Sequence, residues 1–289
     1  MKNAIIATTL ALAAGCATSN CCYTSRTSCK CADAACACTK PCACNAAPNT
    51  LSEDEKADGW KLLWDGKSLD GWVSGRPSTP EYLKAPPPKG WQVKDGVLTV
   101  LPCRYITENR KSMPLPEAEA AKGRGGDIVT AKKYSDFALK LDFKLTRAAN
   151  SGIKYFWNEG VNNNTTLEYQ ILHQDHPDST NGRNYNRCVA ALCDMIPAHA
   201  HARILRPDDW NTALIVCKGM HVEHWLNGVK VVEFERGGDK WNEAFKLSKY
   251  SDPKTNLDGK WGLSKSGRIL LQDHSDSTVH FRNIKIKEL

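Results

Sequence analysis

From Trp60 onward, apolar and polar residues alternate with a period of two, which predicts β-strands rather than helices. The clearest case is 137–145, where nine consecutive positions alternate. A capping box at Ser52 and Glu55 predicts one short helix. We expect further strands at 61–64, 91–93, 97–101, 128–130, 153–157, 167–172, 214–217, 221–226, 229–234, 268–273 and 279–286. About a dozen strands with few helices predict an all-β fold, a sandwich of two antiparallel sheets in a single domain.

One predicted strand, 167–172, carries polar side chains on the face opposite its apolar residues. Glu168 and Gln170 project from that face, and Lys154 does so from the preceding strand. If the two strands pair, a carboxylate, an amide and an ammonium group meet on one sheet face. The alternative is an ordinary solvated face with a Lys–Glu pair, which contributes little to stability.

The histidines are unevenly placed. His173, Asp175 and His176 cluster directly after that strand, which favours metal binding or acid–base chemistry, with a plain polar loop as the alternative. His224 falls between apolar residues of a strand and is expected to be a hydrogen-bonded core residue. Gln272 and His274 share one face at the end of another strand.

The N-terminal region differs in composition from the rest. Nine of the 13 cysteines lie between Cys16 and Cys44. We expect a signal peptide at 1–15, a Cys-rich tether at 16–50 and the folded domain at 51–289. The sequence before Cys16 resembles a bacterial lipobox, which predicts lipidation of Cys16 and an exported lipoprotein of the periplasm or outer membrane. A plain cleaved signal, and soft-metal binding by the tether cysteines, are the alternatives.

The net charge of +7 is spread along the chain, with basic and acidic residues interleaved. A nucleic-acid-binding surface needs a basic stripe, so nucleic acid is not an expected partner. The sequence also lacks a G-x-S-x-G elbow, a P-loop and an H-E-x-x-H motif. The four downstream cysteines lie in apolar or mixed surroundings and are expected to be buried or disulfide-bonded.

Several motifs occur together and in a fixed order. Leu63–Trp72 is similar to "LFDGKTLDGW", and Trp91–Leu98 fits W-x-V-x-D-G-x-L. They are followed by 126–130, 150–155, 168–172, 224–228, 271–274 and 281–284. Together they resemble the 3-keto-disaccharide hydrolase family, also described as 3-keto-glucoside 1,2-lyase and 3-keto-2-hydroxy-glucal hydratase. The resemblance covers about residues 58–289 and implies a concanavalin A-like jelly-roll sandwich.

The resemblance also implies a chemistry. A ketone at C3 of a sugar acidifies the hydrogen on C2, so a base can form an enolate and the C1 substituent can leave. Glu168 or His176 is the expected base, and Lys154 is expected to stabilise the enolate. A divalent metal ion is the alternative electrophile, with His173, Asp175 and His176 as candidate ligands. The expected substrate-binding residues are Gln170, Gln272, His274, Asp127, Trp72 and Arg187.

Two departures from the family pattern are local. His173 and Gln174 stand where acidic residues are common, which bears on any metal site, and Ser275 replaces a usual glycine. The expected ligand is a 3-keto-glycoside or another glycan, and the expected membrane contact is the lipid anchor. Two other functions stay open: a non-catalytic lectin-like module and a conventional sandwich-fold glycoside hydrolase. The latter uses two carboxylates, whereas this strand offers Glu168 followed by the amide Gln170.

Overall fold

The computed structural model describes residues 47–75, 83–108, 111–123, 125–160, 165–180, 185–200 and 204–289. These residues belong almost entirely to one compact unit, Pro48–Leu289. The predicted signal peptide, the lipidation at Cys16 and nearly all of the Cys-rich tether lie outside the described residues. Within the described part, no helix is long and apolar enough to cross a membrane.

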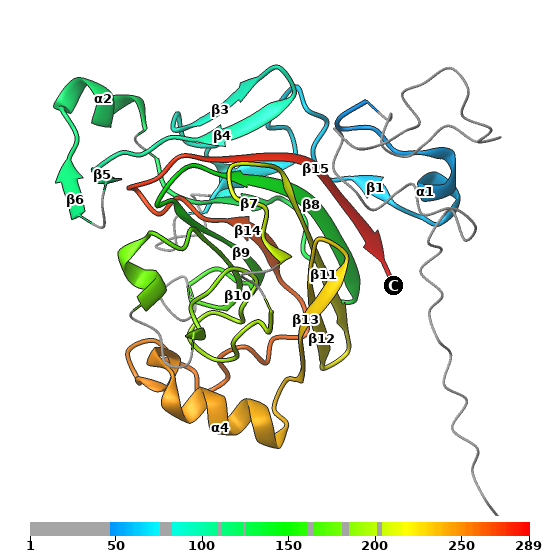
Figure 1. Cartoon of the computed structure of the whole chain (residues 1–289). Helices are drawn as coiled ribbons and strands as arrows, with labels where there is room; N and C mark the ends of the chain where they lie inside the picture. The colour runs from blue at the N-terminus through cyan, green and yellow to red at the C-terminus, as the bar shows by residue number, and fades with distance from the viewer. Residues whose placement is uncertain are drawn as a thin grey trace, which may run out of the picture. The chain divides into compact units, whose positions relative to one another are not determined.

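Two antiparallel sheets form the framework, which confirms the predicted sandwich (Figure 1). The larger sheet has the order β13-β12-β11-β8-β15-β4-β3, with β1 paired to β15. Its strands are β1 (Lys61–Leu62), β3 (Trp91–Lys94), β4 (Val97–Val100), β8 (Phe137–Leu145), β11 (Asn211–Lys218), β12 (His221–Leu226), β13 (Val229–Glu235) and β15 (Val279–Glu288).

The smaller sheet carries the candidate site. Its order is β10-β9-β14-β7-β2. These strands are β2 (Trp72–Ser74), β7 (Ile128–Thr130), β9 (Asn150–Trp157), β10 (Leu167–Leu172) and β14 (Arg268–Leu271). A separate pair is formed by β5 (Tyr105–Glu108) and β6 (Lys111–Pro114). All of the pairings are antiparallel, and most of the strands lie where the alternation predicted them.

The core lies between the two sheets. Phe137, Leu139 and Leu141 of β8 are at most 1% exposed, while the residues between them face outward. Tyr155 of β9 and His224 of β12 join the sheets through a 2.9 Å hydrogen bond between the Tyr hydroxyl and Nε2. The other ring nitrogen of His224 lies 2.9 Å from the carbonyl oxygen of Ala190. His224 is therefore the hydrogen-bonded core residue that the sequence predicted.

The helices are short. α1 (Glu53–Ala57) has the predicted capping box between Ser52 and Glu55. The sequence did not indicate α2 (Glu117–Lys122) or α4 (Asp239–Leu247). Only Trp241 of α4 is buried, so its helical period is hard to recognise. Trp241 stacks between Phe234 and Trp261 and holds α4 at one end of the sandwich, near β13 (Figure 1).

The outer face of the smaller sheet is covered. Every residue of β9 and β10 is buried, so the predicted alternative of a solvated Lys–Glu face is wrong. At the edge of this sheet, the segment 188–196 continues it beyond β10 through backbone hydrogen bonds. Gln170 N donates to the Ala191 carbonyl, Ala190 N donates to the Gln170 carbonyl, and Cys193 N donates to the Glu168 carbonyl.

The end of β9 departs from the predicted alternation. Phe156 adopts a φ of 57°, a left-handed conformation that is unusual for a bulky residue. Trp157 consequently packs with Val129 and Leu270 in a small cluster apart from the main core. The sequence pattern had placed Trp157 on the same face as Tyr155, and the kink at Phe156 is the reason for the difference.

The cysteines of the folded unit are not paired. Cys103, Cys188, Cys193 and Cys217 are free thiols, and the last three are buried. Burial raises the pKa of Cys188 to about 11 and that of Cys193 to about 12. These thiols therefore stay protonated and weakly nucleophilic near neutral pH.

Burial of His224 makes stability depend on pH. Burial lowers its pKa to about 4, against a partly offsetting hydrogen bond to Ala190. The neutral ring therefore stabilises the folded state above pH 6.5. As the pH falls from 6.5 toward 4, the free energy of unfolding decreases by about 3 kcal/mol. We expect His224→Gln to remove this component from the urea-unfolding free energy measured between pH 7 and 4. His221→Gln, at a half-exposed histidine of the same strand, is the control, and an identical pH slope in wild type and His224→Gln would contradict the assignment.

Candidate functional site

A glycine creates a hollow on the outer face of the smaller sheet. Gly152 of β9 lies opposite Gln170 of β10, and Gln272, directly after β14, donates its backbone N–H to the Gly152 carbonyl at 3.0 Å. Two amide side chains on neighbouring strands therefore flank a position that has no side chain. The hollow is the floor of the candidate site.

Glu168 lies across this hollow. A Cβ atom on Gly152 would be 2.1 Å from Oε1 of Glu168, so the carboxylate occupies the space that any other residue would fill. Glu168 is 6% exposed, and its carboxylate makes no hydrogen bond or ion pair with another described residue. A buried carboxylate without a protein partner is costly unless a ligand or water meets it. This favours a functional role for Glu168.

Lys154 lies directly opposite Glu168 in the strand register, as the sequence predicted. The Glu168 side chain, however, leans toward Gly152, and Lys154 is not among the residues that line the cavity. The pairing of the two strands is therefore as expected, while the two charged groups do not meet in the cavity.

A cavity bordered by Glu168, Gln170 and Gln272 has a volume of about 60 Å³ and a polar lining. It is lined by Asn150, Glu168, Gln170, Leu172, Asp178, Arg187, Cys193, Lys249, Gln272 and His274. Oε1 of Gln272 is buried and has no hydrogen-bond partner in the described structure. An unpaired acceptor in a polar cavity is suited to a ligand hydroxyl group.

The Gln170 side chain is fixed from below. Its amide nitrogen donates to Oδ1 of Asn150 at 2.9 Å and to the Ser151 carbonyl at 3.2 Å. The Asn150 amide nitrogen in turn donates to Asp178 at 3.3 Å. This chain of bonds sets which end of each amide is an acceptor. The binding groups are thus held in one arrangement before any ligand is present.

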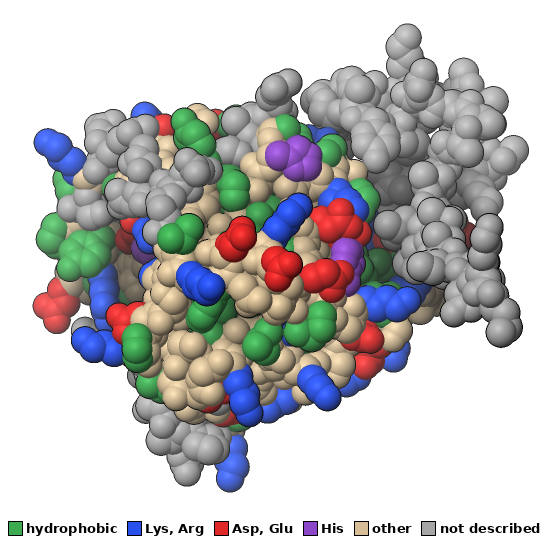
Figure 2. Space-filling view, turned by 90° about the horizontal axis from the view of Figure 1, so that it is seen from below, with side chains coloured by type: hydrophobic (Ala, Val, Ile, Leu, Met, Phe, Trp, Pro, Cys, Tyr) green, Lys and Arg blue, Asp and Glu red, His purple; other side chains and the backbone are tan. Residues whose placement is uncertain are grey.

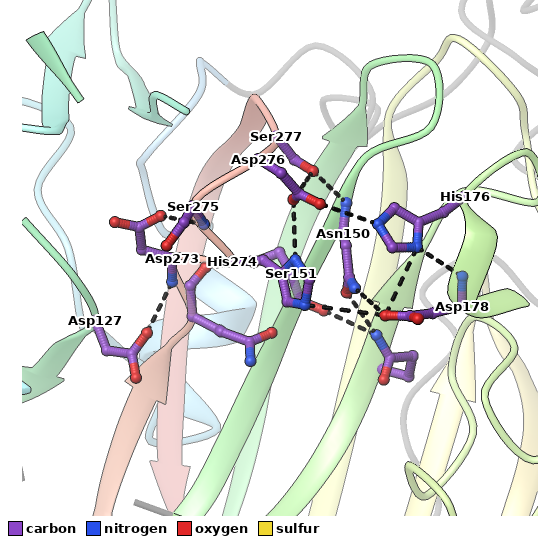
Figure 3. A network of polar contacts seen from close by, with 12 residues as sticks. Asp127, Asn150, Ser151, His176, Asp178, Asp273, His274, Ser275, Asp276 and Ser277 are labelled. Atoms are coloured by element: carbon purple, nitrogen blue, oxygen red, sulfur yellow. Dashed lines mark hydrogen bonds and ion pairs between the residues drawn. The ribbon is translucent and has the colours of Figure 1, made fainter. Parts of the chain in front are cut away.

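Asp276 joins two histidines at one end of the cavity (Figure 3). One carboxylate oxygen lies 3.2 Å from Nε2 of His176, and the other lies 2.9 Å from Nδ1 of His274. The Ser277 hydroxyl donates to Asp276 at 2.6 Å. Asp178 completes the group, 3.8 Å from Nδ1 of His176 and 4.0 Å from Nε2 of His274.

Both ring nitrogens of His176 are engaged. Its Nδ1 accepts the backbone N–H of Asp178 at 3.0 Å, so the neutral ring carries its proton on Nε2 and donates it to Asp276. His176 is 3% exposed and does not line the cavity. This arrangement leaves no free nitrogen for the expected role as a base and is suited to holding Asp276.

His176, His274 and Asp276 have ligand-type atoms within 4.8 Å of one another, which is the spacing of a metal site. The predicted ligands His173 and Asp175 do not join this group: Nδ1 of His173 accepts the backbone N–H of Asp175, and the Asp175 side chain pairs with Arg147. The Nε2 atom of His176 would have to lose its proton to bind a metal. In this arrangement the three groups are satisfied by each other.

Charge determines how His274 titrates. Burial by itself lowers its pKa, but the hydrogen bond to Asp276 and the charges of Asp276, Asp178 and Glu168 outweigh burial and raise it. The same contacts, with His176 and Ser277, hold the pKa of Asp276 well below its usual range despite burial. His274 therefore carries a proton over a wider pH range than an ordinary histidine.

Two further carboxylates, Asp127 and Asp273, bind the backbone next to the cavity floor. Oδ1 of Asp127 accepts the backbone N–H of Asp273, and Asp273 accepts the backbone N–H groups of Gly126 and Ser275 (Figure 3). Burial, reinforced by the Asp127 charge, raises the pKa of Asp273 to about 6 despite those hydrogen bonds. Asp127 thus fixes the chain that leads into His274 and lies outside the cavity lining.

The structure brings together five of the residues that the sequence indicated: Glu168, Gln170, Gln272, His274 and Arg187. Trp72 is not one of them, because it is 2% exposed and its indole N–H donates to the Leu63 carbonyl in the core. Sequence reasoning missed Asn150, Asp178, Asp276, Cys193 and Lys249. For Asp276, a carboxylate two residues after His274, the local sequence offered a signal.

A second group with metal-site spacing lies on the larger sheet. It consists of His221, Glu223 and Glu233 on the β12–β13 hairpin. Lys230 already neutralises it, with Nζ 3.2 Å from Glu223 and 2.8 Å from Glu233. Figure 2 shows acidic and basic side chains mixed in this way over the face seen from below. We interpret this group as a surface ion-pair network.

Comparisons with known proteins place the chain in one family. Residues 59–287 match the sequence profile of the 3-keto-alpha-glucoside-1,2-lyase-like domain. A 3-keto-disaccharide hydrolase of Bacteroides thetaiotaomicron is 32% identical over 252 residues, which are 81% of this chain and 79% of that protein.

Two solved structures from Parabacteroides distasonis, both of proposed glycosyl hydrolases, are similar to the whole unit. One is 30% identical with a TM-score of 0.65 and covers 84% of this chain and 100% of its own. The other is 27% identical with a TM-score of 0.52 and covers 80% and 99%.

The contacts of His274 predict a measurable change. Asp276→Asn removes the hydrogen-bonded charge that raises the His274 pKa, so we expect that pKa to fall toward or below 6.5. The measurement is an NMR titration of the His274 ring. Asp175→Asn, which removes a carboxylate paired with Arg147, is the control and should leave the pKa unchanged. A His274 pKa unaffected by Asp276→Asn would show that Asp276 does not set it.

Proposed function

Since the chain belongs to the 3-keto-disaccharide hydrolase family of 3-keto-alpha-glucoside-1,2-lyase-like domains, we propose that it cleaves 3-keto-glycosides by removing the C2 proton. The substrate is a sugar whose C3 ketone acidifies that proton, and loss of the C1 substituent then gives a 3-keto-2-hydroxy-glucal. Hydration of the glucal in the same site completes a net hydrolysis. The substrate class is carbohydrate, in keeping with the family.

Glu168 is the base in this proposal, and the observation that supports it most is the environment of its carboxylate. The group is buried over Gly152, faces the cavity and has no described hydrogen-bond or ion-pair partner. Proton abstraction requires a base that a bound ligand can reach and that is not already paired with another charged group. His176, the other base expected from the sequence, has both nitrogens engaged.

His274 is the acid that protonates the leaving oxygen. Its pKa is raised by Asp276, Asp178 and Glu168 against the effect of burial, so the ring holds a proton that it can donate. Gln272 directly follows β14 and lies beside Gly152 of β9, and His274 lies two residues further along the chain. Glu168 reaches Gly152 from β10, which lies on the opposite side of β9 from β14. A sugar ring over Gly152 therefore lies between the base and the acid.

Substrate hydroxyl groups are bound by the amides of the floor. The buried, unpaired Oε1 of Gln272 accepts one hydroxyl, and Gln170, fixed by Asn150, presents its own oxygen to another. The cavity itself holds only part of a sugar, so the leaving group extends toward solvent. In this mechanism the cavity side chains supply the base, the acid and the hydrogen bonds, while His176 and His274 are held by Asp276.

The second carboxylate in the cavity, Asp178, favours one competing function, a conventional glycoside hydrolase. That mechanism needs two carboxyl groups on either side of the bond that is cleaved. Asp178, however, accepts a hydrogen bond from Asn150 and lies within 4.0 Å of two histidines, which suits a charge partner better than an acid. A lectin-like module would keep the binding groups but has no use for an unpaired Glu168.

The test is turnover of 3-keto-trehalose and a 3-keto-glucoside by the full chain and by Glu168→Gln. We expect the variant to lose turnover by at least about 100-fold and to keep binding of the matching unoxidised sugar. Added chelator should leave wild-type turnover unchanged. Cleavage of unoxidised glycosides alone would support the conventional hydrolase. Glycan binding without turnover of any 3-keto-sugar would support the lectin-like module and overturn the proposal.

Gly152→Ala tests the geometry of the base. The added methyl group would lie 2.1 Å from Oε1 of Glu168, so the carboxylate must move away from its position over the floor. We expect turnover to fall about 100-fold, because a shift of about 1 Å in a reacting group has that effect. Gly238→Ala, near the start of α4, is the control. Unchanged turnover in a folded Gly152→Ala variant would show that the position of Glu168 does not matter.

A further inference from the structure

The proposed reaction develops a negative charge on the substrate that Glu168, itself a carboxylate, cannot offset. When Glu168 takes the C2 proton, the C–H electron pair forms a C2–C3 double bond, and the carbonyl pair moves onto the C3 oxygen. That oxygen needs hydrogen-bond donors or positive charge close to it. Lys154, expected from the sequence, does not line the cavity.

Two other cationic residues do line the cavity, Arg187 and Lys249. Among the described residues, the Arg187 side chain bonds only through its Nε atom, which donates to Oδ1 of Asp194 at 2.8 Å. Its two terminal nitrogens have no hydrogen-bond partner among the described residues. They remain available as a pair of donors in fixed, planar geometry, which suits recognition of an oxygen anion.

Lys249 contributes a second positive charge at the mouth of the cavity. Its ammonium group forms no ion pair with a described residue and lies 5.1 Å from the centre of the Tyr250 ring. Its charge acts on the thiol of Cys193, another residue of the cavity lining. The charge of Arg187 also interacts with Cys193, so both cationic groups act on this part of the cavity lining.

Asp194 holds these two residues together. Oδ1 accepts Nε of Arg187, and Oδ2 accepts the backbone N–H of Lys249 at 2.7 Å. The Asp194 backbone N–H donates to the Asn186 carbonyl at 2.8 Å, which closes the segment between Asn186 and Asp194 into a loop. Asp194 is 6% exposed and adopts a φ of 60°, a conformation that aspartate tolerates better than most residues.

The geometry points to an enolate-binding subsite made of Arg187 and Lys249, with Asp194 as the positioning residue that aims both toward the cavity. The inference rests on the proposed function and adds the group that stabilises its intermediate. Asp194 does not touch the substrate. It binds the Arg187 guanidinium group through Nε, which leaves the two terminal nitrogens for the cavity. It also binds the backbone N–H of Lys249 and so ties that residue to the same loop.

The experiment isolates proton removal from bond cleavage. 3-Keto-1,5-anhydroglucitol has the C3 ketone and the C2 hydrogen but no leaving group at C1. In D₂O, Glu168 takes the C2 proton, exchanges it with solvent and returns a deuteron, so enolate formation appears as loss of the C2 signal in the NMR spectrum. The C4 hydrogen, also next to the ketone, reports uncatalysed exchange in the same sample.

We expect wild-type protein to catalyse exchange at C2 and not at C4. Arg187→Met and Asp194→Ala should each lower kcat for exchange about 100-fold with little change in KM, and Lys249→Met should lower it less, because Lys249 is exposed. Arg187→Lys keeps the charge but loses the paired donors and should not restore the rate. Added guanidinium should partly rescue an Arg187→Ala variant.

A double-mutant cycle separates positioning from a structural effect. If Asp194 acts through Arg187, the variant that combines Asp194→Ala with Arg187→Met should be no slower than Arg187→Met alone. Glu159→Gln is the matched control, because Glu159 also bridges a lysine and an arginine, 2.8 Å from Lys133 and 2.7 Å from Arg268, outside the cavity. Melting temperatures of all variants report any loss of fold.

The outcomes are distinct. If wild type exchanges C2 and Glu168→Gln does not, while Arg187→Met and Asp194→Ala keep the wild-type rate, the enolate subsite is wrong and the proposed function stands. If the cycle is additive, Asp194 does not position Arg187. If wild type itself shows no exchange at C2, the proposed function fails together with the subsite.

Discussion

The three backbone hydrogen bonds between segment 188–196 and the edge strand β10 are the constraint on which the site depends. An edge strand offers unpaired N–H and carbonyl groups, and this segment satisfies them. By doing so it extends the sheet whose outer face carries Glu168, Gln170 and Lys154, all of which are buried. The polar face becomes a buried one, and its groups act in a medium where charge and hydrogen bonds count for more than in water.

The same segment also contributes to the site, since Cys193 lines the cavity. Arg187 precedes it and Asp194 follows directly after the last backbone bond to Glu168. The base is therefore on the sheet, and Asp194, within this segment, binds Arg187 and the backbone of Lys249. Main-chain bonds fix Asp194 relative to Glu168, and the Asp194 side chain then fixes Arg187. This is the rigidity that a preorganised site requires.

The sequence predicted the framework well because alternation reports burial directly. The long strand β8 and the pairing that brings Lys154 opposite Glu168 followed from the period of two. The burial of this face could not be predicted, since segment 188–196 has no regular period and nothing in the sequence indicates that its backbone bonds to β10. That is why Lys249 and Asp194 were missed and why the face with Glu168 could be taken for a solvated one. The kink at Phe156 is likewise a local conformation that alternation does not encode.

The free thiols affect how the protein folds. Cys188, Cys193 and Cys217 are buried and carry raised pKa values, so the native protein offers no reactive thiolate from these positions. The unfolded chain, in contrast, exposes them together with the nine cysteines of the N-terminal region. Folding and thiol oxidation are therefore in kinetic competition: a chain that folds first withdraws three of its 13 cysteines from disulfide exchange, and one that oxidises first risks trapping them in non-native pairs.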